Sequence, residues 1–102
     1  MQVERWDVDE DGELTEEALR EKLREKGYSV STYRYPPGTS FSTHTHSVDK
    51  IDAVLAGQFK ITMGGEEAIL ERGDWVYVPA GEEHAAEVVG DETVVSLDAA
   101  KR

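Results

Sequence analysis

The sequence predicts an all-β fold, an antiparallel β-sandwich or closed barrel, with one short helix near its N-terminus. Two observations predict the barrel: about eight short runs of strand-forming residues follow one another after residue 27, and turns rich in glycine and proline separate them. A third observation predicts the helix, because residues 1–27 are dense in charge and carry a narrow apolar stripe. A chain of 102 residues has room for one such domain.

The turns define the expected strands. Gly64-Gly65 is a strong hairpin signal, and the segment from Pro79 to Gly81 turns the chain into another strand. We expect strands over residues 29–35, 40–46, 51–56, 59–63, 68–70, 75–78, 84–89 and 93–97. We therefore assign residues 1–27 to an acidic arm and helix, and residues 28–102 to the barrel.

The expected helix covers residues 15–26. Thr15 is a good N-cap, Glu16 and Glu17 suit the first turn, and Gly27 is a natural stop. The helix is expected to dock on the barrel through an apolar stripe of Ala18, Leu19 and Leu23.

The segment before the helix resembles the start of a calcium-binding EF-hand loop, with Asp7, Asp9, Asp11 and Gly12 at the right spacing. The match fails at Ala18, where that loop needs a bidentate glutamate, and only six residues are available for an incoming helix. We expect an exposed acidic arm, with an additional strand or anchoring segment around residues 6–8.

Composition excludes several partners. The 22 acidic residues against 11 basic ones give a net charge of −11, which repels nucleic acid and anionic membrane surfaces. No apolar run approaches the length of a membrane helix, and the acidic N-terminus lacks the apolar core of a signal peptide. The absence of cysteine excludes disulfides and thiolate ligands, so we expect a cytoplasmic protein.

The three histidines form the candidate site. His44 and His46 are two residues apart, so alternation along a strand would place both side chains on one face. His84 begins another expected strand after a proline-glycine turn, and a closed sheet could bring it opposite the pair. Three neutral imidazoles suit a divalent transition metal (Fe, Mn, Ni, Cu or Zn) and leave coordination positions open for water or substrate.

The residues around these histidines resemble the two motifs of the cupin superfamily. The first motif is matched by Gly38, His44, His46 and Gly57 in the family's spacing, and the second by Gly73, Pro79, Gly81 and His84. The 15 residues between Gly57 and Gly73 are similar to the short spacer of small bacterial cupins. The resemblance implies a jelly-roll-like cupin barrel with a metal inside, near one open end, and a tendency to form homodimers.

Two positions depart from the cupin pattern. Val88 replaces an asparagine, and Lys50 occupies the place of the glutamate that would be a fourth ligand. We favour a three-histidine centre in which Lys50 pairs with Asp52 on the same strand face, or holds an anionic substrate. Alternatively, Asp49 or Asp52 replaces the lost carboxylate through a shift of register, or the barrel has lost its metal and binds a small anion directly.

Five further side chains are candidates for the cavity lining, although we expect most of them to be ordinary core. They are Phe41, Phe59, Met63, Trp75 and Tyr77.

Three functions are compatible with these residues. The first is a small-molecule metalloenzyme, such as an oxygenase, whose catalytic residues beyond the metal are unknown; Lys50 and Asp52 are candidates to support the metal site. The second is a binding or sensing module that captures a small ligand, with or without metal, and does not convert it. The third is an empty barrel with an interaction role, in which residues 3–8 or 29–35 pair between two subunits.

Overall fold

The computed structural model describes all residues, 1–102. The elements follow one another as β1 (Val3–Arg5), α1 (Val8–Asp11), α2 (Glu16–Glu25), β2 (Tyr28–Tyr35), β3 (Ser40–His44), β4 (Lys50–Ala56), β5 (Gln58–Met63), β6 (Glu66–Leu70), β7 (Asp74–Val78), β8 (His84–Val89) and β9 (Val94–Lys101).

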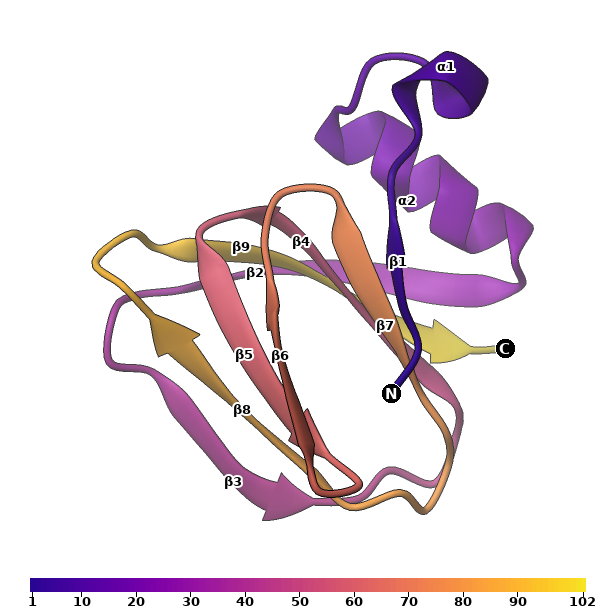
Figure 1. Ribbon diagram of the computed structural model, residues 1–102. Helices are drawn as coiled ribbons and strands as arrows, with labels where there is room; N and C mark the ends of the chain where they lie inside the picture. Colours follow the sequence, from indigo (N-terminus) through magenta and orange to yellow (C-terminus); the bar gives the residue numbers. More distant parts are fainter.

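The strands form two antiparallel sheets that face each other (Figure 1). The five-stranded sheet has the order β1-β7-β4-β9-β2, and the four-stranded sheet has the order β3-β8-β5-β6. Strands β1, β2, β3 and β6 are therefore the sheet edges. The predicted antiparallel β-sandwich is confirmed, and the turns at Gly64-Gly65 and around Pro79 connect the strands that the sequence indicates.

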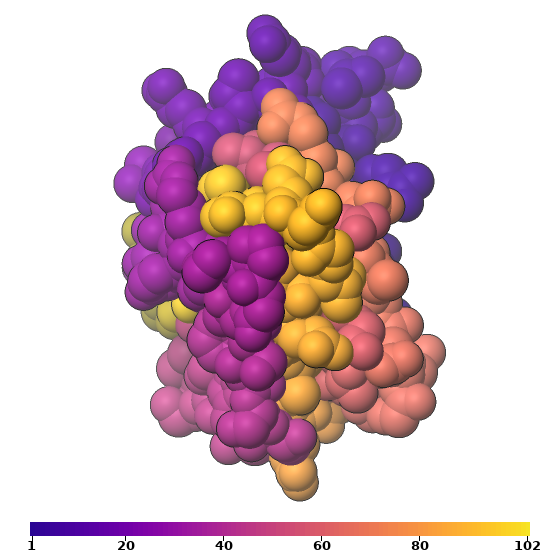
Figure 2. Space-filling view, turned by 90° about the vertical axis from the view of Figure 1, so that its left-hand side faces the viewer, coloured from indigo at the N-terminus to yellow at the C-terminus, as the bar shows by residue number.

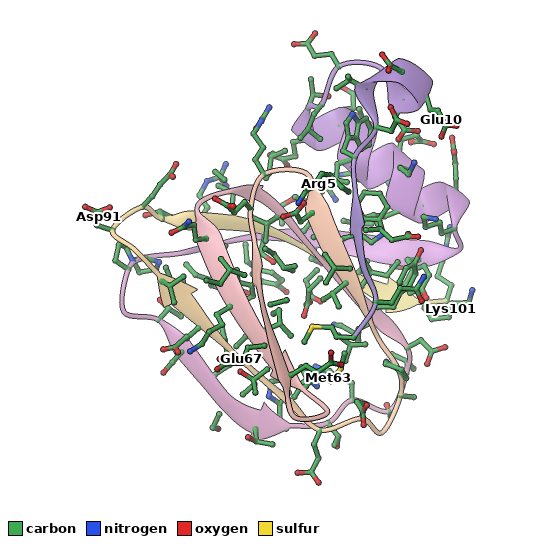
Figure 3. The ribbon with its side chains drawn as sticks, viewed as in Figure 1. Arg5, Glu10, Met63, Glu67, Asp91 and Lys101 are labelled. Atoms are coloured by element: carbon green, nitrogen blue, oxygen red, sulfur yellow. The ribbon has the colours of Figure 1, made fainter.

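The central strands of the five-stranded sheet, β4, β7 and β9, bury side chains on both faces, because successive residues of a strand point to opposite sides of the sheet. Val54 and Val76 point between the sheets, where they pack with Phe59 and Ile61 of the opposite sheet. Met63, labelled in Figure 3, belongs to this interior, whereas Glu67 of the neighbouring β6 is exposed. Because this core between the sheets is apolar, a polar functional site is expected only where polar side chains replace apolar ones on the inner faces.

The other face of the five-stranded sheet is covered by α2. Leu19 and Leu23 of the helix are fully buried against a second cluster that includes Ile51 and Trp75. The Thr15 hydroxyl accepts a hydrogen bond from the Ala18 N–H at 3.0 Å, so the predicted N-cap is confirmed. Figure 2 shows the two helices, in indigo, gathered at one end of the molecule. Neither helix has the length and apolar character of a membrane span.

The N-terminal arm differs from its prediction in two ways. The additional strand is Val3–Arg5, not residues 6–8, and a second helix, α1, occupies Val8–Asp11. The reason is local: the Asp7 carboxylate caps α1 by accepting a hydrogen bond from the Asp9 N–H. The Asp11 carboxylate pairs with Lys22 of α2 at 2.7 Å and thereby joins the arm to the helix.

Two glycines of the cupin-like pattern make a matched test of backbone constraint. Both have positive φ, 79° at Gly57 and 88° at Gly38, but a Cβ at Gly57 would lie 2.8 Å from the Thr93 carbonyl oxygen, whereas a Cβ at Gly38 meets nothing within 4 Å. We expect Gly38→Ala to cost only backbone strain, about 1 kcal/mol, and Gly57→Ala to cost roughly 3 kcal/mol or more because the clash is with backbone. Urea unfolding of both variants measures this; equal losses of stability would contradict it.

Candidate metal centre

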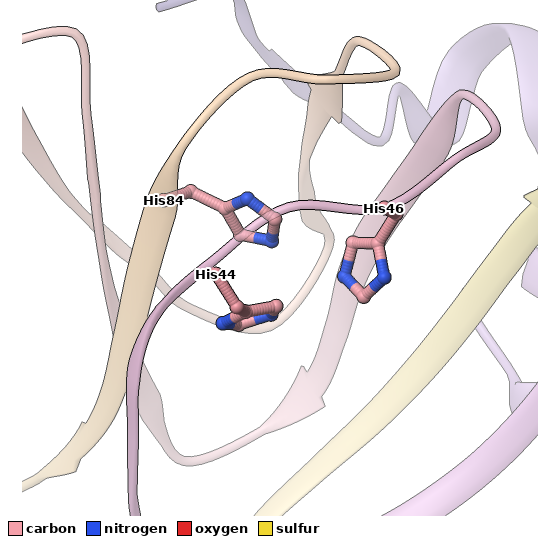
Figure 4. A group of neighbouring side chains, drawn as sticks. All are labelled: His44, His46 and His84. Atoms are coloured by element: carbon pink, nitrogen blue, oxygen red, sulfur yellow. The ribbon is translucent and has the colours of Figure 1, made fainter.

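The three histidines meet at one end of the barrel. Their ring centroids are 4.3 Å apart for His44 and His84, 4.8 Å for His44 and His46, and 5.0 Å for His46 and His84. The three potential ligand atoms all lie within 4.8 Å of one another, compared with about 3.4 Å between nitrogen ligands around a tetrahedral zinc ion. Figure 4 shows the rings turned toward a common centre. This group of histidines could hold a metal ion.

Hydrogen bonds fix the tautomers of two of these rings. The Nδ1 of His44 lies 2.6 Å from the Ser42 carbonyl oxygen, and the Nδ1 of His84 lies 3.0 Å from the Glu82 carbonyl oxygen. Because a carbonyl only accepts, each Nδ1 carries the proton and donates it, and each Nε2 keeps a free lone pair. This is the arrangement that orients imidazoles for a metal.

Strand pairing and one loop bring the histidines together. His44 and His84 are directly opposite each other in the pairing of β3 with β8. The prediction that His46 lies on the same strand is wrong, because β3 ends at His44 and its pairing is irregular between Phe41 and His44. His46 instead follows in the connecting loop, where its carbonyl oxygen accepts a hydrogen bond from the Gly81 N–H at 2.9 Å.

Asp49 ties the same loop to the turn before His84. Its carboxylate accepts a hydrogen bond from the Ala80 N–H at 2.8 Å. This side chain is exposed and does not line the cavity beside the histidines. Its contact therefore indicates a role in holding the two histidine-bearing segments together.

Lys50 does not pair with Asp52 as predicted. Its amine lies 2.8 Å from the Asp98 carboxylate, because Asp98 of β9 is its diagonal neighbour on the same face, two residues from Ala100, which stands directly opposite Lys50. Asp52 stands directly opposite Asp98 in the pairing of β4 with β9. Burial, followed by the negative charge of Asp98, raises the pKa of Asp52 to about 6.

His46 has a lowered pKa. Burial is the largest cause, and the positive charge of Lys50 and the neighbouring His84 and His44 act in the same direction. The neutral imidazole, which is the form that binds a metal, is therefore favoured at neutral pH.

A cavity of about 150 Å³ lies beside the histidines. Besides the three imidazoles it is lined by Tyr35, Phe41, Asp52, Phe59, Ala86, Ser96 and Asp98. Of the five aromatic and sulfur candidates, Phe41 and Phe59 reach this lining, while Met63 and Trp75 are core as expected. Sequence reasoning missed Tyr35, Ser96 and Asp98, because only the pairing of β2, β4 and β9 places them on the inner face.

A larger hollow, of about 710 Å³, lies at the other end of the molecule. It is lined by residues such as Arg5 and Asp91, which Figure 3 shows far from Met63, the cross-strand partner of His84. Arg5 of this hollow pairs with Asp74 at 3.1 Å, and Arg72 donates hydrogen bonds to the carbonyl oxygens of Leu55 and Leu14, while no histidine lines it. We therefore take the smaller cavity as the candidate site.

The raised pKa of Asp52 contributes a loss of stability to metal-free protein as pH rises. Between the unfolded value near 3.9 and the folded value of about 6, Asp52 binds more protons in the folded protein than in the unfolded chain, so its contribution to the free energy of unfolding falls with increasing pH. We expect Asp52→Asn to remove most of this slope and to stabilise the metal-free protein at pH 7.5 by on the order of 2 kcal/mol. Urea unfolding in EDTA between pH 4 and about 7.5 measures it. Asp91→Asn, in an exposed turn, is the control, and an unchanged slope in Asp52→Asn would contradict the assignment.

Comparison with known proteins identifies the fold family. A family model described as a cupin domain matches residues 31–99. An uncharacterized protein of Streptomyces coelicolor is 42% identical over 62 residues, which are 61% of this chain and 59% of the relative. The match thus spans less than two thirds of that relative's length.

Solved structures agree. A cupin protein of Bacteroides fragilis is similar with a TM-score of 0.64 and 26% identity, covering 82% of this chain and 73% of that one. The DMSP lyase DddQ of Ruegeria pomeroyi is similar with a TM-score of 0.66 and 26% identity, covering 74% of this chain and 39% of that one. The family model covers more than half of the chain and the motif residues lie where the barrel needs them, so this chain belongs to the cupin domain family.

Proposed function

We propose that this cupin is a small-molecule metalloenzyme that holds one divalent transition metal through His44, His46 and His84. The observation that carries the proposal is the convergence of three imidazoles, two of them oriented by carbonyl oxygens, beside a cavity. A divalent ion bound there would act as a Lewis acid toward an oxygen of the substrate. The similarity to a lyase of the same fold supports an enzymatic role.

The charges around the site support a three-histidine centre without a carboxylate ligand. The group of ligand atoms that lie close together consists of the three histidines alone. The positive charge of Lys50, which would repel a divalent ion, is compensated by Asp98 at 2.8 Å. Three neutral ligands leave the ion's double charge intact, so an anionic oxygen of a small substrate is the favoured additional ligand.

Metal analysis of purified protein tests the proposal. After reconstitution we expect one ion per chain, and a fall to below about a tenth of that occupancy in His46→Ala and His84→Ala at matched free metal. The His46 ring makes no hydrogen bond to the protein, so its removal separates loss of metal from loss of folding. Thr45→Ala, in the same loop and exposed, is the matched control.

Full occupancy in His46→Ala would contradict the assigned ligands, and a wild-type protein without metal after reconstitution would overturn the proposal.

The predicted homodimer, the edge-strand pairing through β1 or β2, and the cytoplasmic location stay predictions.

A further inference from the structure

The cavity beside the histidines has two chemically different walls. One wall carries the carboxylates of Asp52 and Asp98, and another carries the aromatic rings of Tyr35, Phe41 and Phe59. Neither wall is needed to hold a metal through three imidazoles. The chemistry of these two walls therefore indicates which class of ligand the cavity binds.

The carboxylate wall has an unbalanced negative charge. Asp52 and Asp98 face each other directly across β4 and β9, and like charges in that arrangement repel. The amine of Lys50 pairs with Asp98, but no ion pair or hydrogen bond from the protein reaches Asp52. Lys50 itself does not line the cavity. Asp52 is thus a partly buried carboxylate that faces the cavity and has no partner of its own.

The aromatic wall is a connected cluster. Tyr35 lies 5.0 Å from Phe41 and 5.7 Å from Phe59, and the rings of Phe41 and Phe59 are perpendicular at 6.3 Å. Phe41 meets both other rings at steep angles, 68° with Tyr35 and 90° with Phe59, whereas Tyr35 and Phe59 are stacked at 30°. The cluster therefore has ring faces as well as edges at its surface, and a ring face attracts a positive charge. Aromatic rings together with an unpaired carboxylate form the usual surroundings of an organic cation in a protein.

The size of the cavity limits the ligand. About 150 Å³ is well below the roughly 300–1,000 Å³ of pockets that take drug-sized molecules. The histidines lie on the same cavity as the two walls, so a single small molecule can contact all three groups.

We propose that the ligand is a small zwitterion, whose anionic oxygen faces the histidine centre and whose ammonium or other onium group lies between Asp52 and the rings of Tyr35, Phe41 and Phe59. The placement of the anionic end depends on the metal site proposed above, whereas the placement of the cationic end depends only on the two walls of the cavity.

Two molecules of the same shape test the cationic end. Glycine betaine and 3,3-dimethylbutanoate share a carboxylate and differ only in a quaternary nitrogen in place of a carbon. Calorimetry on metal-loaded protein should show betaine binding at least about tenfold more tightly. Asp52→Asn should remove most of this preference, while Asp91→Asn, at the far end of the barrel, should keep it.

Equal or tighter binding of 3,3-dimethylbutanoate would overturn the proposal, as would an unchanged preference in Asp52→Asn, or binding of neither compound by protein of full metal content. Choline and 3,3-dimethylbutan-1-ol make the same comparison in metal-free protein, at millimolar concentration. A preference for choline there supports the cation site even if the metal site fails. If the protein takes up one metal ion but shows neither the betaine preference when metal-loaded nor the choline preference when metal-free, the cation site is refuted and the metal site stands.

Discussion

The pairing of β3 with β8 is the constraint on which the site depends. It places His44 opposite His84, two residues that are 40 positions apart in the chain. Two hydrogen bonds donated by backbone N–H groups continue this contact beyond the strands. The Gly81 N–H donates to the His46 carbonyl oxygen, and the Ala80 N–H donates to the Asp49 carboxylate. The loop that carries His46 is thus held against the turn that leads into His84, and the third imidazole is positioned without being on a strand.

The five-stranded sheet explains why so small a barrel can hold a polar cavity. Small domains bury a limited share of their surface, so polar residues in the interior reduce an already small core. Here α2 provides a second core on the outer face of the sheet, with Leu19 and Leu23 fully buried. This outer cluster adds buried apolar surface. On the inner face, three positions of β4 and β9 are polar: Asp52, Ser96 and Asp98, which line the cavity.

The sequence was sufficient for the features that local chemistry determines. Glycine and proline turns predicted the strands, Thr15 predicted the start of α2, and the expected closed sheet indicated how His84 could come to lie opposite the other two histidines. The sequence was insufficient where the register between distant strands determines which side chains become neighbours. Asp98 is the partner of Lys50 only because β4 and β9 pair in one register, and a single sequence contains no signal for that pairing. The irregular pairing after Phe41, which moves His46 off the strand, was hidden for the same reason.

The central claim is that three imidazoles and no carboxylate of the protein bind the metal. X-ray absorption spectroscopy of the cobalt- or zinc-loaded protein measures this directly. We expect three imidazole nitrogens at about 2.0–2.1 Å, with the remaining ligand an oxygen that is unchanged in Asp52→Asn and Asp98→Asn. Fewer than three imidazoles, or an oxygen ligand lost in either aspartate variant, would contradict the account.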